Sequence, residues 1–229
     1  MLVTRPEEQS GDTVRLLREL GHEPLLDPLL RIVRLPPPGE IPVGTAALAV
    51  TSANAVPALA ALPSDLPVFA VGQATARALS LAGRPPTAVA GGDGADLAQL
   101  LAGRLPAGST VLHVAGRDVR PGLAEELAAA GLVYRRAVVY AAEPADRLAP
   151  GTQAALAADG LDAVLLFSPR TAALFASLVR AAGLAPHLAP TVAACLSEAV
   201  AAELTGLNFA AVRVAEARDQ KALLRRLDG

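Results

Sequence analysis

The chain is poor in several features that mark particular classes of protein. Its 229 residues include one cysteine, Cys195, and no tryptophan, and aromatic residues make up 3% of the sequence. A single cysteine excludes a disulfide framework within the chain. The formal net charge is −2, without an excess of basic residues. Because nucleic-acid-binding proteins usually combine a basic face with stacking aromatic residues, we expect no nucleic-acid partner.

Long uninterrupted apolar runs are absent as well. Although 52% of the residues are hydrophobic, no stretch of about 18 residues is free of polar or helix-breaking residues. The sequence begins with an apolar strand, Leu2–Thr4, rather than with the basic segment and apolar stretch of a secretory signal. We therefore expect a soluble protein of the cytoplasm with no membrane partner.

The sequence also lacks the usual signatures of metal and cofactor sites. Its three histidines are His22, His113 and His187. They are scattered, with no cysteine or carboxylate at ligand spacing, and there is no GxSxG elbow, P-loop or GxGxxG fingerprint. The stretch GGDGAD at 91–96 lacks the lysine of a phosphate loop, so we interpret it as a turn in which Asp93 or Asp96 caps a helix. A bound metal is therefore not expected.

What the chain does contain is a regular alternation of short apolar runs and amphipathic helical stretches. The expected strands are 2–4, 46–51, 68–71, 111–114, 163–167 and 192–196, with weaker ones at 87–90 and 211–214. Continuous apolar strands that alternate with helices are typical of parallel sheets covered by helices on both faces. The predicted fold class is therefore α/β, with doubly wound parallel sheets of the flavodoxin or Rossmann kind.

The alternating units also repeat. Three strand–helix units in the first half of the chain resemble three in the second half, so that Gly21 corresponds to Gly131 and Ser52 to Ser168. A repeated supersecondary unit determines the architecture before any residue is given a role. Two similar lobes imply a cleft between the domains.

Two extended segments interrupt the alternation and predict where the chain crosses between the lobes. LLDPLLRIVRLPPP, ending at Pro38, finishes in three prolines that cannot donate to a central sheet ladder. A second segment, YRRAVVYAAEP at 134–144, is also expected to be extended and would lead the chain back to the first lobe. If the two lie side by side as a two-stranded β-ladder, one domain is discontinuous. The predicted parts are a domain of residues 1–33 plus 146–229, a domain of residues 40–134, and linker strands 34–39 and 135–145. The alternative is two consecutive lobes that meet near Leu105.

Hydroxyl and amide side chains recur where a strand ends and a helix begins, as at 51–54 and 168–171. Ordinary N-capping explains any one of them, because Ser, Thr and Asn accept hydrogen bonds from the first N–H groups of a helix. Together they mark the carboxyl ends of the strands, where open α/β sheets bind ligands. Such an edge can hold a large anion through backbone N–H groups without any net positive charge.

Six short motifs follow one another along the chain. They are VTRP at 3–6, TSANAV at 51–56, AVGQATA at 70–76, AGRDVRPGLAEELAAAG at 115–131, VVYAAEP at 138–144 and LLFSPRTAALF at 165–175. Each motif alone is weak, but in this order the set resembles the uroporphyrinogen-III synthase family over essentially the whole chain. The resemblance implies two α/β lobes joined by a two-stranded ladder.

By the same resemblance, the chain is a cofactor-free enzyme of tetrapyrrole biosynthesis. It would convert linear hydroxymethylbilane, which carries eight carboxylates, into uroporphyrinogen III, with inversion of the last pyrrole ring and loss of water. The implied partners are this substrate and, for a transient hand-off, hydroxymethylbilane synthase, and the chain is expected to be a monomer. The alternative is a non-catalytic two-lobed binding protein or sensor for a small anionic metabolite.

The family reaction passes through an azafulvene, formed when the terminal hydroxyl departs, and a spiro intermediate. Cyclisation without inversion occurs readily in solution, so the enzyme must mainly hold the substrate in the conformation that leads to the spiro species. Tyr140 matches a tyrosine that the family places at the cleft, and its hydroxyl could assist departure of the substrate hydroxyl as a proton donor. A tyrosine in a linker strand can also be a packing residue with a solvated hydroxyl.

The substrate-binding residues suggested by the resemblance lie mostly at strand ends. They are Thr4, Arg5, Thr51, Ser52, Ala53, Asn54, Val56, Gly72, Thr75, Gly116, Arg117, Ser168, Pro169, Arg170 and Ser197. The arginines among them could pair with propionate or acetate groups, although surface arginines often only interact with solvent.

One segment departs from the family pattern. Gly72 and Thr75 match a GxxTA turn, in which the missing side chain permits close approach of the substrate. In the corresponding segment ACLSEAV, Leu196 stands where Gly72 does. Substrate contact by this segment is therefore in doubt, while Ser197 is still expected to cap its helix.

Overall fold

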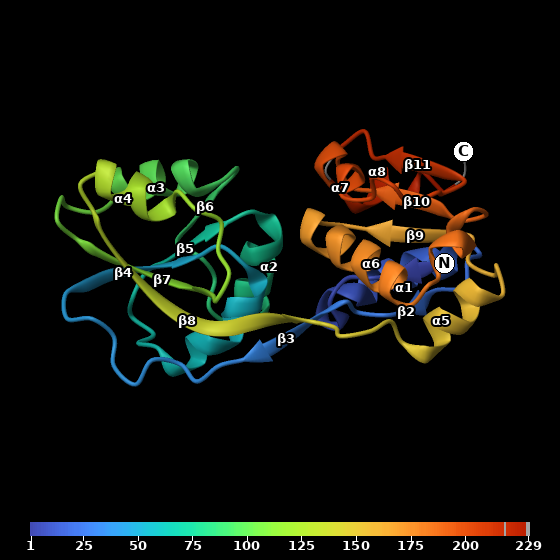
Figure 1. The fold of residues 1–229 in the computed structure, drawn as a ribbon. Coiled ribbons are helices and arrows are strands. Elements are labelled where there is room, and N and C mark those ends of the chain that lie inside the picture. Colours follow the sequence, from blue (N-terminus) through green and yellow to red (C-terminus); the bar gives the residue numbers. More distant parts are fainter. Residues whose placement is uncertain (218, 228–229) are drawn as a thin grey trace. The chain divides into compact units, whose positions relative to one another are not determined.

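The computed structural model describes residues 1–217 and 219–227. The chain divides into two compact units (Figure 1). Unit 1 is formed by Met1–Arg31 together with Glu143–Gly229, and unit 2 by Ile32–Ala142. Unit 1 is thus discontinuous in sequence.

The sheet of unit 1 has the strand order β2-β1-β9-β10-β11, and all its neighbouring strands are parallel. The strands are β1 (Leu2–Val3), β2 (Leu25–Leu26), β9 (Ala163–Leu166), β10 (Val192–Cys195) and β11 (Ala211–Val214). The helices are α1 (Glu7–Glu19), α5 (Pro150–Ala157), α6 (Pro169–Ala181), η2 (Ala185–Leu188), α7 (Glu198–Ala202) and α8 (Gln220–Leu224). This order is that of flavodoxin-like sheets.

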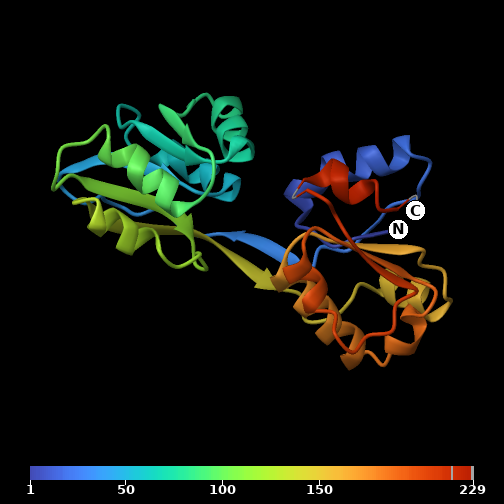
Figure 2. The same cartoon turned by 90° about the horizontal axis from the view of Figure 1, so that it is seen from above.

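Helices cover both faces of this sheet because its strands are apolar on both faces. Successive side chains of a strand point to opposite faces. Val164 packs with Phe175 of α6 in one core cluster, whereas Leu165 packs with Leu17 of α1 and Leu223 of α8 in another. Figure 2 views the ribbon from above, with the helices of each unit on both sides of its sheet.

The sheet of unit 2 has the order β3-β8-β7-β4-β5-β6, and the strands from β8 to β6 are parallel. Its strands are β3 (Leu30–Arg34), β4 (Thr45–Val50), β5 (Val68–Val71), β6 (Ala88–Ala90), β7 (Thr110–Gly116) and β8 (Val133–Pro144). Its helices are η1 (Ala53–Ala61), α2 (Gln73–Leu81), α3 (Gly94–Ala102) and α4 (Leu123–Ala129). The helices η1 and α2 cover one face, and α3 and α4 cover the other.

The two sheets repeat one another, as the sequence predicts. The order β8-β7-β4-β5-β6 in unit 2 matches β2-β1-β9-β10-β11 in unit 1. Gly21 and Gly131 each follow the C-cap residue of the corresponding helix, and Ser52 and Ser168 each cap the helix of the next repeated unit. The register of the strands is the same as well. In unit 1, Val3 pairs with Leu165 on one side and with Leu26 on the other. At the equivalent position of unit 2, His113 pairs with Ala49 and with Arg136.

The strands β3 and β8 connect the units. They are neighbours in the sheet, and the Leu35 amide donates to the Val139 carbonyl at 2.9 Å. Arg31 and Glu143 form an exposed ion pair at 2.9 Å. The linker boundaries expected at 34–39 and 135–145 stay a prediction.

The helix after β4 differs in type from the expected one. Residues Ala53–Ala61 form a 3₁₀ helix with Pro57 in its interior. Proline has no N–H to donate to an α-helical ladder, and the Ala55 amide bonds to the Ser52 carbonyl three residues earlier.

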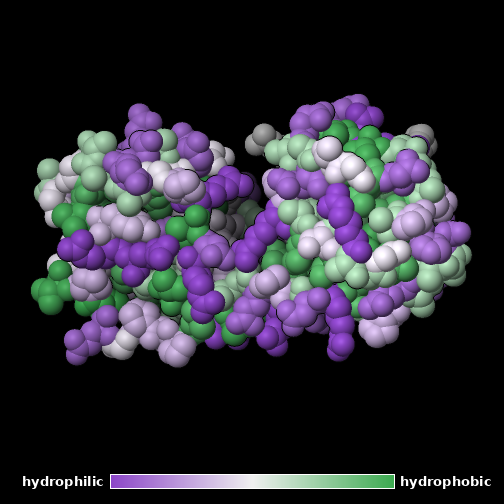
Figure 3. Space-filling model, in the orientation of Figure 1, coloured by the Kyte–Doolittle hydropathy of each residue, from purple (hydrophilic) through white to green (hydrophobic). Residues whose placement is uncertain are grey.

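On the face that Figure 3 draws, hydrophilic side chains cover much of each unit. Within the described residues, no helix combines the length and the hydropathy needed to cross a membrane.

Candidate functional site

A pocket of about 400 Å³ opens at the carboxyl edge of the sheet in unit 2. It is lined by Thr51, Ser52, Val71, Gly92, Asp93, Gly94, His113, Gly116, Asp118, Val119, Arg120, Pro121, Leu123 and Tyr140. The chain runs from β7 to β8 on one side of the sheet and from β4 to β5 on the other, so β7 and β4 form the topological switch point. Ligands of open α/β sheets bind at this point.

Tyr140 reaches the pocket because β8 contains a bulge. Ala115 pairs with Val138, but the next residue of β7, Gly116, pairs with Tyr140, so β8 has one extra residue there. A bulge re-aims the side chains that follow it. The tyrosine ring therefore lies over Gly116, where a Cβ atom would come within 2.6 Å of the ring. Gly116 is required for the position of Tyr140.

On the face of this sheet opposite to the Tyr140 ring, three side chains form a chain of hydrogen bonds. Thr51 Oγ1 lies 2.9 Å from His113 Nε2, and His113 Nδ1 lies 3.1 Å from the Tyr134 hydroxyl. The His113 side chain is buried, and burial together with Arg136 lowers its pKa from 6.5 to about 4. His113 is therefore neutral near pH 7. Burial raises the pKa of the Tyr134 phenol, which keeps its proton.

Ser52 and the turn after β6 supply helix starts at the pocket. Ser52 caps η1 and accepts a hydrogen bond from the Asn54 amide at 3.3 Å. Asp93 caps α3 by accepting from the amides of Ala95 and Asp96, which confirms the interpretation of the glycine-rich stretch as a capped turn.

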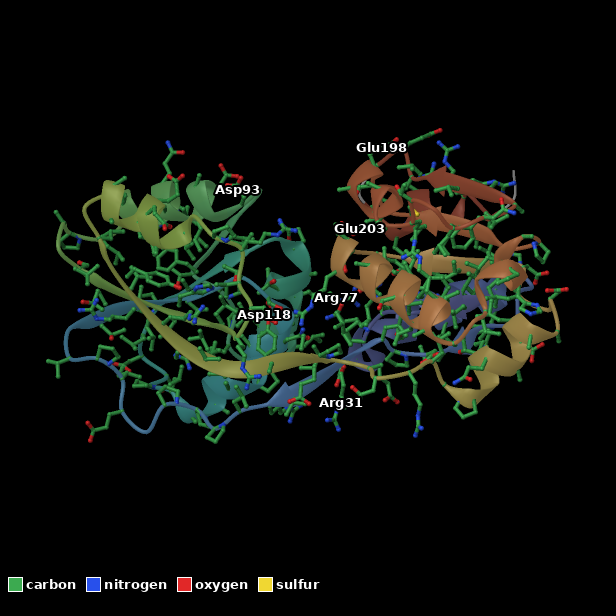
Figure 4. All side chains as sticks on the ribbon, in the orientation of Figure 1. Arg31, Arg77, Asp93, Asp118, Glu198 and Glu203 are labelled. Atoms are coloured by element: carbon green, nitrogen blue, oxygen red, sulfur yellow. The ribbon has the colours of Figure 1, made fainter. Side chains whose placement is uncertain are left out.

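The pocket carries charges of both signs. Asp93 at the start of α3 and Asp118 after β7 are labelled in Figure 4. Arg120, also exposed, lines the same pocket. These charged groups lie outside the strands, whereas the buried His113 lies on β7.

The other substrate-binding residues that the sequence suggests in unit 2 do not line this pocket. Val56 and Thr75 are buried at 6% and 5% exposure, so they contribute to packing in this unit. Gly72 caps α2 with a φ of 76°, which explains why a glycine occupies this position. Ala53 and Asn54 begin η1, and the Arg117 amide donates to the Tyr140 carbonyl at 2.8 Å.

At the equivalent edge of unit 1, side chains contact one another. Thr4 is fully buried and donates to the Leu165 carbonyl at 2.8 Å, so it joins β1 to β9. The Arg5 guanidinium lies 4.4 Å from the centre of the Phe167 ring and donates to Gln220 at 2.8 Å. Burial lowers the pKa of Arg5, and its Nε has no hydrogen-bond partner among the described residues.

The helix starts of unit 1 follow the expected pattern in one case and depart from it in another. Ser168 caps α6 by accepting from the Thr171 amide at 3.2 Å, and Pro169 and Arg170 are exposed in its first turn. Ser197 occupies the N-cap position of α7, but its side chain makes no capping hydrogen bond. The expectation that Ser197 caps its helix through its side chain is therefore wrong.

The structure brings together Thr51, Ser52, Gly116 and Tyr140 from the expected set. Sequence reasoning missed His113, although a histidine within the apolar strand VLHVAG is a signal that could have found it. Thr51, directly after β4, and His113 in β7 lie 62 positions apart, so only the register of β4 and β7 reveals their contact.

No group of three or more His, Cys, Asp or Glu side chains that could hold a metal ion occurs in the part of the chain that the structure describes. Cys195 is buried in β10, and burial raises the pKa of its thiol to about 12. A thiol with such a pKa is a poor nucleophile near neutral pH.

Comparison with known proteins gives a consistent result. The model of a family described as uroporphyrinogen-III synthase HemD matches residues 11–225. No curated protein matches the chain by sequence. The crystal structure of uroporphyrinogen-III synthetase from Helicobacter pylori 26695 aligns with a TM-score of 0.65 at 19% identity, over 90% of this chain and 91% of that one. A mutant synthase from the extremely thermophilic bacterium Thermus thermophilus aligns with a TM-score of 0.53 at 21% identity, over 99% and 96% of the two chains. At these identities, the two structures support the fold.

Proposed function

Because the chain belongs to the uroporphyrinogen-III synthase family, we propose that the pocket of unit 2 is where it cyclises hydroxymethylbilane to uroporphyrinogen III. The match over residues 11–225 is the observation that carries the reaction. The location is supported by the pocket at the switch point, which combines Thr51, Tyr140 and several backbone amides.

Tyr140 is the proposed proton donor to the departing hydroxyl of the substrate. Its ring is half-buried over Gly116 and its side chain lines the pocket. A phenol can donate a proton as the C–O bond breaks, so that water leaves with that proton, and the azafulvene remains once the pyrrole N–H returns a proton to the phenolate. The attack of the substituted carbon of the last ring then needs a fixed substrate conformation, which the pocket walls would supply.

The substrate carboxylates are proposed to bind at helix starts and arginines. In unit 2 these groups are Ser52, Ala53, Asn54, Arg117 and the turn at Gly72. In unit 1 they are Arg5, Ser168, Pro169, Arg170 and Ser197, at the carboxyl edge of its sheet. Backbone N–H groups at such an edge favour anions.

Three finer points belong to the same proposal. We propose that the protein acts as a monomer, that it works in the cytoplasm, and that hydroxymethylbilane synthase delivers its substrate directly. Two α/β units of this size that each bury a core need no second copy to fold.

A coupled assay tests the function. Freshly generated hydroxymethylbilane is supplied, and the product isomers are separated by chromatography. We expect uroporphyrinogen III, formed faster than the spontaneous cyclisation. If only uroporphyrinogen I appears, at the rate seen without protein, the chain is not a synthase, and saturable substrate binding would then favour the sensor alternative.

A further inference from the structure

We propose that His113 is a positioning residue that, together with Tyr134, directs the Thr51 hydroxyl proton into the pocket as a hydrogen-bond donor to a substrate oxygen. The catalytic consequence rests on the proposed function of this pocket. The hydrogen-bond direction within the protein does not depend on that function.

Three side chains on one face of the sheet carry the inference. His113 pairs with Ala49 of β4 and Arg136 of β8, and Thr51 and Tyr134 lie two positions from these partners on the same face. The imidazole thus bridges two hydroxyl groups, at 2.9 Å to Thr51 and 3.1 Å to Tyr134. Of the two hydroxyl-bearing residues, Thr51 belongs to the pocket lining.

A neutral imidazole has one donor and one acceptor nitrogen. One hydroxyl must therefore donate to the ring, and the other must accept from it. A phenol, even one whose pKa burial raises above the ordinary value of about 10, is a stronger donor than an aliphatic alcohol. Tyr134 accordingly donates to Nδ1, and the protonated Nε2 donates to Thr51 Oγ1.

The Thr51 hydroxyl then has its acceptor position engaged and its proton directed elsewhere. Threonine is branched at Cβ, so its χ1 is restricted and the hydroxyl is held in place. A fixed O–H group at the pocket wall suits a carboxylate or the oxygen of a departing hydroxyl. If both hydrogen bonds of His113 ran in the opposite direction, the Thr51 hydroxyl would donate its proton to the imidazole. It could then only accept from a ligand, and the pocket would lose this donor.

The repeated fold argues against a purely structural role for His113. Val3 occupies the equivalent position in unit 1, with the same pairing register, and it is fully buried. Phe167, one residue before the cap Ser168, occupies the position of Thr51. Since an apolar pair fills this place in the repeat, the fold itself does not require a histidine there.

The tautomer of His113 gives a direct test without substrate. Protein labelled with nitrogen-15 in its histidines is measured by long-range proton–nitrogen NMR, and His22→Gln and His187→Gln assign the other two rings. We expect Nε2 of His113 to carry the proton and Nδ1 to be unprotonated. Protonation at Nδ1 instead would overturn the proposed direction.

A double-mutant cycle tests the catalytic consequence. Tyr134→Phe removes the donor to Nδ1, and we expect kcat to fall by about fivefold at unchanged KM, as for the loss of one oriented hydrogen bond. In a Thr51→Val background the same change should have no further effect. An equal fractional loss in both backgrounds would show that Tyr134 acts only through the structure of the unit.

Two further variants keep the outcomes distinct. Thr51→Ser retains the hydroxyl and should restore most of the turnover lost in Thr51→Val, whereas equal turnover of the two would contradict the donor role. His187→Gln, in unit 1, is the matched histidine control and should leave turnover unchanged. If wild-type protein makes no uroporphyrinogen III, the proposed function fails, but the NMR result still decides the hydrogen-bond direction.

Discussion

The two sheets have the same strand order and register, yet their switch points differ. In unit 2 the positions at the edge hold Thr51 and His113, and a pocket opens beside them. In unit 1 the equivalent positions hold Phe167 and Val3, and the Arg5 guanidinium stacks on the Phe167 ring. The duplicated fold supplies the same edge twice, and the side chains at the two switch points make the edges chemically different.

The two units also use the polar side chains at these edges differently. Unit 1 uses Thr4 to join two strands through the Leu165 carbonyl, so its hydroxyl is consumed within the sheet. Unit 2 bonds two hydroxyls to one imidazole, and in the proposed hydrogen-bond direction an O–H proton of Thr51 faces the pocket. The comparison predicts that substitutions at the edge of unit 2 affect turnover more than equivalent ones in unit 1.

The largest expected effect is that of Tyr140→Phe. Loss of the phenol proton should lower kcat roughly 100-fold, because general acid assistance contributes on this scale. KM should change little, since the ring remains. Steady-state kinetics of uroporphyrinogen III formation measure both constants, and an unchanged kcat would leave Tyr140 as a packing residue.

Gly116→Ala should lower kcat by about tenfold, because a small displacement of a reacting group is costly. The new Cβ would meet the Tyr140 ring at 2.6 Å, so the ring must move. The matched control is Gly11→Ala in α1, where nothing lies within 4 Å of the added atom. Equal kinetics of the two variants would show that the position of Tyr140 is unimportant.

His113→Val introduces the residue that occupies the equivalent position of unit 1, Val3. This substitution should remove a pH dependence of the stability of unit 2. The pKa of His113 falls from 6.5 to about 4 on folding, so the unfolded chain binds more protons between these pH values. The free energy of unfolding should therefore decrease as the pH falls through this window, by up to roughly 3 kcal/mol.

Both tyrosines, Tyr134 and Tyr140, lie in unit 2 and the chain has no tryptophan, so tyrosine fluorescence reports the unfolding of this unit. Urea titrations between pH 7 and pH 4 then compare the wild type with His113→Val. The variant should lack the His113 component of the decrease. Parallel curves for the two proteins would contradict a buried, neutral His113.

The smallest expected effect is that of Gly72→Ala. Its φ of 76° is unfavourable for residues with a Cβ, which should lower the stability of unit 2 by about 1 kcal/mol. The urea midpoint followed by tyrosine fluorescence measures the change. An unaltered midpoint would mean that this turn adjusts its backbone without cost.

Local patterns made much of this fold predictable. The apolar runs are strands, and the matched pairs Gly21 with Gly131 and Ser52 with Ser168 correctly indicated the repeat. The caps at Ser168 and Asp93 followed from residue type and position. These features depend on a few neighbouring residues, which is why sequence reasoning finds them.

The site was predictable only in part because it depends on register. Tyr140 was expected to be important, but its orientation results from the bulge opposite Gly116, which alternation alone does not reveal. His113 contacts residues 62 and 21 positions away, so its partners appear only when the strands are aligned. Ser197 has the residue type of a cap without the bond, because composition does not determine side-chain direction.

A crystal structure with uroporphyrinogen III bound would test the location of the reaction most directly. We expect polar atoms of the macrocycle or its carboxylates to lie within about 3 Å of the Thr51 or Tyr140 hydroxyl. A product bound elsewhere, with the pocket beside His113 unoccupied, would contradict it.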